Sequence, residues 1–133
     1  MKPESILVLL LVAAGCADST SGLPPGTRNV ILSAVAEGVS GNAALVEETG
    51  GVSTVWVTLQ GLEPGVSYNG RVGHGTCEDP GSDAISLARL STSTAIGWAV
   101  TRNVPDSVLL AGFHIRYAGP GQPPPPVACG NID

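Results

Sequence analysis

Short apolar runs with a two-residue period recur from Asn29 to the end of the chain, and glycine or proline separates them. In residues 52–59, valine and leucine alternate with polar residues and with Trp56. Such alternation is typical of a strand with one face in the core, so Trp56 should project from the other face. Residues 49–51, Thr-Gly-Gly, indicate a tight hairpin, because glycine accepts the positive φ that such turns require.

The whole pattern predicts seven or eight short strands. They cover residues 30–35, 42–48, 52–59, a segment within 61–77, then 84–90, 92–101, 113–117 and 127–132. Residues 105–112 favour one helical turn ended by Gly112, and the proline-rich residues 118–126 favour an irregular loop. With eighteen glycines, eleven prolines and almost no helix signal, an all-β antiparallel sandwich or small barrel is expected.

The charge balance excludes one class of function. The net charge is −5, and Lys2 is the one lysine in the sequence. A nucleic-acid-binding protein needs a basic surface that displaces counterions, so no nucleic-acid partner is expected. The acidic residues within 78–83 predict a solvated turn, because a calcium loop needs more oxygen ligands at set spacing.

The N-terminal residues have the composition of an export signal. Residues 6–14 form an unbroken apolar run of nine, too short to span a bilayer but suited to a signal peptide. Ala13-Ala14-Gly15-Cys16 follows and resembles the bacterial lipobox, which implies cleavage after Gly15 and acylation of Cys16. An ordinary signal peptide with an incidental cysteine is the alternative. We therefore expect a signal peptide over 1–15, a lipidated flexible tether over 16–28 and a β-sandwich domain over 29–133.

Three short motifs resemble the copper/zinc superoxide dismutase superfamily, and most of all its small bacterial lipoproteins. The motifs are Gly-Leu-x-Pro-Gly at 61–65, Gly-Thr-Cys at 75–77 and Val-Ala-Cys-Gly at 127–130. The resemblance covers roughly residues 42–132 and implies a Greek-key β-sandwich. It also implies a disulfide between Cys77 and Cys129, which are the two cysteines that remain if Cys16 carries lipid.

The metal ligands of that family do not carry over. The family has a His-x-His pair on the strand before Gly-Thr-Cys, where this chain has Arg71-Val72-Gly73. Arginine stays protonated and glycine has no side chain, so neither can bind copper. His74 is one residue out of phase, and the later strand that should supply another histidine has Tyr117 near that point. No metal or other cofactor is expected.

Five residues remain as a candidate binding patch: Tyr68, Arg71, His74, His114 and Arg116. The two arginines with Tyr68 favour binding of an anion, although solvated strand positions explain them equally well. His74 is expected as a polar residue between turn glycines, and His114 as the outward member of a strand beside Arg116. A metal site built from His74, His114 and Asp79 is a further alternative.

These observations favour a binding or structural role over an enzymatic one, since neither histidine lies in a recognisable nucleophile–base setting. We expect a lipoprotein of the bacterial cell envelope, on the periplasmic or outer-membrane face, that contacts the membrane through its lipid. The sequence does not indicate which protein partner or small ligand it binds. One alternative is a metal-dependent superoxide dismutase, which needs at least three converging imidazoles. The other is an adhesion or assembly module, suggested by the Ser/Thr-rich strands.

Overall fold

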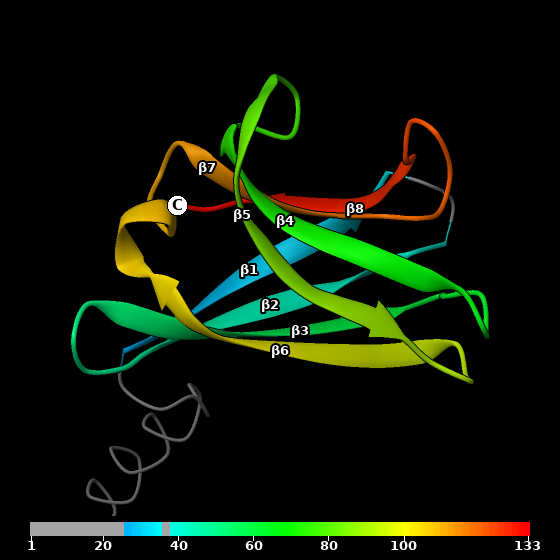
Figure 1. The fold of residues 1–133 in the computed structure, drawn as a ribbon, viewed down its shortest axis with the longest axis horizontal. Coiled ribbons are helices and arrows are strands. Elements are labelled where there is room, and N and C mark those ends of the chain that lie inside the picture. Colours follow the sequence, from blue (N-terminus) through cyan, green and yellow to red (C-terminus); the bar gives the residue numbers. More distant parts are fainter. Residues whose placement is uncertain (1–25, 36–37) are drawn as a thin grey trace, which may run out of the picture.

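The computed structural model describes residues 26–35 and 38–133, and they form eight antiparallel strands (Figure 1). The strands are β1 (Thr27–Ala34), β2 (Ser40–Glu47), β3 (Val52–Gln60), β4 (Ser67–Gly75), β5 (Pro80–Ser91), β6 (Ile96–Pro105), β7 (Phe113–Ala118) and β8 (Pro126–Asn131). A short 3-10 helix, η2 (Asp106–Val108), precedes β7. The predicted all-β class is confirmed.

The strands are arranged as an antiparallel Greek-key β-sandwich. Their hydrogen-bonded order is β5-β4-β7-β8-β1-β2-β3-β6, and Figure 1 shows the two halves of this order as two layers. The halves join where Ser33 and Ala34 of β1 pair with Cys129 and Ala128 of β8. The two edge strands approach each other at the far side, where the backbone N–H of Ala88 in β5 donates to Thr101 Oγ1 in β6 over 2.7 Å.

The core lies between the layers and is built from every second residue of the strands. In β3, Val55, Val57 and Leu59 are buried, whereas Trp56 between them is 43% exposed. The predicted alternation of this strand is therefore confirmed, and Trp56 projects from the outer face. Tyr117 is the largest fully buried side chain and fills the interior beside β4.

The turns follow the predicted glycine chemistry. Gly50 and Gly51 both have positive φ, 87° and 79°, and connect β2 to β3 as a tight hairpin. The expected helical turn is η2, and Ser53 Oγ fixes it by donating to Asp106 Oδ1 over 2.6 Å. Gly112 was expected to end this helical turn, but η2 ends at Val108 and Gly112, with φ of 97°, instead directly precedes β7.

Three predicted strand starts were wrong, and β6 also ends at Pro105 and not at residue 101. β1 begins at Thr27, inside the segment 16–28 that was expected to be tether, because Thr27 and Arg28 pair with Val46 and Leu45 of β2. β5 begins at Pro80, so residues 80–83 of the expected acidic turn 78–83 belong to a strand paired with β4. β6 begins at Ile96 and not at Thr92, because the Thr92 hydroxyl bonds to backbone groups and forms a turn there.

The expected signal peptide and the lipidation site at Cys16 lie outside the described residues. Within the described part of the chain, no helix has both the length and the apolar character needed to cross a bilayer.

Candidate functional site

Two arginines lie side by side on the outer face of β4 and β7. Arg71 pairs directly with Arg116 in the strand register, and Asp83 of β5 lies between them. Asp83 Oδ2 is 3.3 Å from Arg71 Nη1, and Asp83 Oδ1 is 3.1 Å from Arg116 Nη2. One carboxylate therefore bridges two guanidinium groups that would otherwise repel each other, and the cluster keeps a formal charge of +1.

The arginine cluster borders a hollow of about 320 Å³. Its other walls are Asn69, Ala118, Pro123 and Pro124 of the β7–β8 loop, and Pro126 at the start of β8. The ion-pairing side chains are 27% to 44% exposed, so water screens the pairs and each contributes only about 0–1 kcal/mol to folding. Both guanidinium groups thus keep access to solvent on a surface that could hold a small anionic group.

Tyr68 is not part of this surface. It lies on the opposite, core-facing side of β4 and is 5% exposed. Its hydroxyl oxygen accepts a hydrogen bond from the backbone N–H of Glu63 over 3.0 Å, which ties the β3–β4 turn to the core. The expected grouping of Tyr68 with the two arginines was therefore wrong, because successive side chains of a strand point to opposite faces.

The two histidines do not converge. His74 pairs with Phe113 in the register, and their ring centroids are 4.8 Å apart. His114 is the next residue of β7, so its side chain leaves the sheet on the opposite face, beside Arg116. No group of three or more His, Cys, Asp or Glu side chains that could hold a metal ion is found among residues 26–35 and 38–133.

His114 is buried, which the sequence did not predict. It is 1% exposed although it occupies an outward position of β7. Its ring lies over Gly73 of β4, where a β-carbon would come within 2.8 Å of His114 Cε1. His114 Nδ1 donates to the Gly75 carbonyl oxygen over 3.3 Å, and Nε2 has no hydrogen-bond partner. Because Gly73 has no side chain, it leaves the space that the ring occupies.

Cys77 and Cys129 form a disulfide that links the loop after β4 to β8, as the resemblance implied. Asn131 of β8 supports this link from the side. Its Oδ1 accepts from the backbone N–H of Cys77 over 2.8 Å, and its Nδ2 donates to Glu78 Oε1 over 3.3 Å. Hydrogen bonds from the Glu78 backbone N–H and from Asn131 hold the pKa of the Glu78 carboxyl below its usual value.

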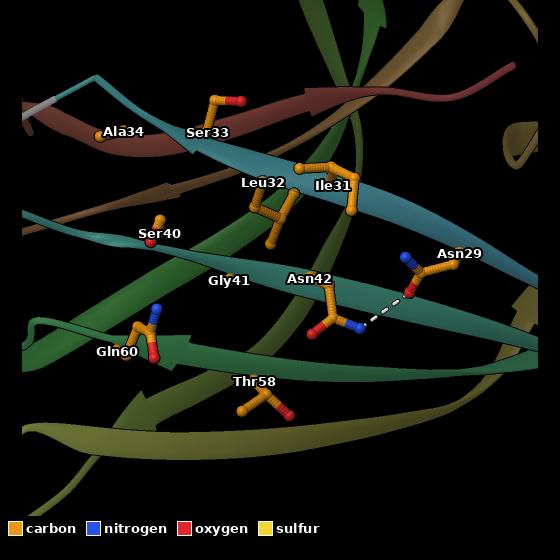
Figure 2. A pocket seen from close by; sticks show the side chains of 10 residues that line it. All are labelled: Asn29, Ile31, Leu32, Ser33, Ala34, Ser40, Gly41, Asn42, Thr58 and Gln60. Atoms are coloured by element: carbon orange, nitrogen blue, oxygen red, sulfur yellow. Dashed lines mark hydrogen bonds between the residues drawn. The ribbon is translucent and has the colours of Figure 1, made fainter.

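A second hollow, of about 570 Å³, lies on the outer face of β1, β2 and β3 (Figure 2). Uncharged residues line it, and two of them are linked because Asn42 Nδ2 of β2 donates to Asn29 Oδ1 of β1 over 2.8 Å. None of its residues was among the binding residues predicted from the sequence. The signal was present in the alternation of β3, which places Thr58 and Gln60 on the same outward face as Trp56.

No protein-family model matches the chain, and no curated protein matches it either.

Proposed function

We propose that this protein is a lipoprotein of the bacterial cell envelope whose dismutase-like β-sandwich serves as a binding or structural module and carries no metal. The strand order and the link from the loop after β4 to the last strand support the dismutase-like part of the proposal. The lipobox-like Ala13–Cys16 supports the anchor.

One observation carries the metal-free assignment. The family's metal-binding histidines correspond to Arg71 and Gly73 in this chain, and other groups fill the space there. The His114 ring lies against Gly73, so a side chain at that position would collide with it. Arg71 in turn is held by Asp83, which also pairs with Arg116. A cationic, ion-paired cluster repels a metal cation, and guanidinium groups cannot become ligands.

The metal-dependent dismutase is the first alternative. It needs several imidazoles around one ion. The sequence holds two histidines, and His74 and His114 project from opposite faces of the β4–β7 pair. The adhesion or assembly module is the second alternative, and the open outer face of β1, β2, β3 and β6 favours it, because both tryptophans are exposed there.

Metal loading tests the proposal directly. Protein incubated with copper and zinc and then desalted should retain less than one equivalent of metal and show no dismutase activity. Loading of a His74→Ala, His114→Ala variant provides the control. Stoichiometric copper in the native protein that disappears from this variant would establish a metal site and refute the metal-free module.

The anchor is tested separately, because it does not depend on the sandwich. Radiolabelled palmitate should enter the native protein in the producing bacterium and should not enter a Cys16→Ser variant. A native protein that never acquires the label is not a lipoprotein.

A further inference from the structure

The outer face of β1, β2, β3 and β6 is almost free of charge. The strand register places Ile31, Asn42, Thr58 and Trp98 in one row across the four strands. The next row is Asn29, Ala44, Trp56 and Val100. Among the outward-facing positions of these four strands, which are all described, Arg102 near the end of β6 is the one charged residue. In a chain of net charge −5, this neutrality marks a distinct surface.

The two tryptophans stand next to each other on this face. Trp56 is opposite Val100, and Trp98 is opposite Thr58, so the two indoles are diagonal neighbours with backbones about 7–8 Å apart. Trp98 is 68% exposed and Trp56 is 43% exposed. A soluble domain gains nothing from leaving two large aromatic surfaces in water, and such surfaces usually mark a binding site.

The hollow of Figure 2 adjoins the tryptophans and offers hydrogen-bonding groups. Thr58 lines the hollow and is also the cross-strand partner of Trp98. Because Asn42 Nδ2 donates to Asn29 Oδ1, the other ends of these amides stay available, an acceptor on Asn42 and two donors on Asn29. Gln60 and Ser40 add further uncharged groups at the rim.

We propose that this face binds a neutral oligosaccharide. The C–H face of a pyranose ring is apolar and weakly positive, so it stacks on the negative face of an indole. The ring hydroxyls are donors and acceptors at once, which suits paired amides and threonine hydroxyls. A nucleic acid or an acidic glycan would find one cation here, Arg102, and an apolar protein surface would leave the amides of the hollow unpaired.

This proposal goes beyond the proposed function and is independent of the metal question. It concerns the sheet opposite the arginine cluster, so retention of a metal at β4 and β7 would refute the metal-free module and leave the oligosaccharide site untouched.

Intrinsic fluorescence gives a direct test, because the chain contains two tryptophans and both lie on this face. The full chain is purified in a zwitterionic detergent, whose headgroup contains no sugar that could compete. It is then titrated with cellohexaose, with N-acetylchitohexaose and with an acidic oligogalacturonate. At least one of the two neutral sugars should shift the emission in a saturable manner, and the acidic sugar should not.

Three variants test whether Trp98 is responsible for the sugar binding. Trp98→Ala should weaken binding of the active sugar at least tenfold by calorimetry, and Trp98→Phe should restore part of the affinity because a stacking ring remains. Leu110→Ala removes a similarly exposed apolar side chain away from this face and should bind normally. Circular dichroism and the melting temperature check that the Trp98 variants are folded.

Two results would overturn the proposal. The first is the absence of any emission change or heat with both neutral sugars at millimolar concentration. The second is a native protein that sediments as a dimer while Trp98→Ala sediments as a monomer, since the face would then be covered by a second copy of the chain.

Discussion

Tyr117 connects three strands through a single side chain. It starts from β7, its ring lies over Gly70 of β4, and its hydroxyl donates to the carbonyl oxygen of Ala88 in β5 over 3.0 Å. A β-carbon at Gly70 would overlap this ring, so only glycine fits there. Burial raises the pKa of the Tyr117 hydroxyl well above its usual value, because the charged phenolate would lose its hydration.

The raised pKa of Tyr117 predicts a loss of stability at alkaline pH. Above about pH 10, an unfolded tyrosine releases its proton while the folded one keeps it. The free energy of unfolding should therefore be unaffected by this group below about pH 10 and fall above it, by up to about 1.4 kcal/mol per pH unit. Urea unfolding between pH 8 and pH 11 measures the slope. Tyr117→Phe should flatten it, and equal slopes in both proteins would contradict the assignment.

His114 shows why one residue could not be placed from the sequence. Its outward position on β7 follows from alternation with Ile115 and Tyr117, and the structure agrees with that position. Its burial depends on Gly73, which lies opposite on β4 but forty-one residues earlier in the chain. The two-residue period of a strand predicts to which face of the sheet a side chain points. Whether that side chain is buried depends on the size of the residue opposite it on the neighbouring strand.

At the scale of elements, residues 70–75 of β4 contain three glycines, and a strand with so few side chains to pack is one that we would expect to loosen early. The structure gives a different account of the same glycines. Gly70 receives the Tyr117 ring on the core face, and Gly73 receives the His114 ring on the outer face. Aromatic rings of β7 therefore pack against both faces of β4. They occupy the space that side chains at Gly70 and Gly73 would otherwise fill.

The centres of the strands were predictable and their ends were not. Alternation identified the cores of β3 and β7, since each repeats an apolar residue at every second position. The start of β1 at Thr27 is set by its pairing with Val46 of β2, and the start of β5 at Pro80 by its pairing with Gly75 of β4. Strand ends depend on what the neighbouring strand presents, so the alternation within a single strand does not mark them.

For the whole molecule, the link between Cys77 and Cys129 closes a loop whose ends are 52 residues apart. It joins the loop after β4 to the last strand, and it lies near the β1–β8 junction that connects the two sheets. Chain-entropy reasoning gives such a link about 4 kcal/mol of stability, through restriction of the unfolded chain. A single domain is stable by only about 5–15 kcal/mol in total, so this share is large.

Loss of the link should therefore lower the melting temperature by roughly 15 °C. Thermal unfolding of a soluble form that begins at Ala17, with and without reductant, measures the difference. A Cys77→Ala, Cys129→Ala variant is the control and should melt at one temperature in both conditions. Two reactive thiols in the unfolded, unreduced native protein, or a melting point indifferent to reductant, would show that the link is absent or without effect.

The sequence by itself determined the class of fold, because two-residue periodicity and glycine-rich turns act locally. It also determined that Arg71 and Gly73 cannot bind a metal, because that follows from residue type alone. Only the tertiary structure decided which groups meet. It placed Asp83 between the two arginines and set Trp56 beside Trp98. Both arrangements depend on the register between strands distant in sequence, and register is fixed by packing across the whole sandwich.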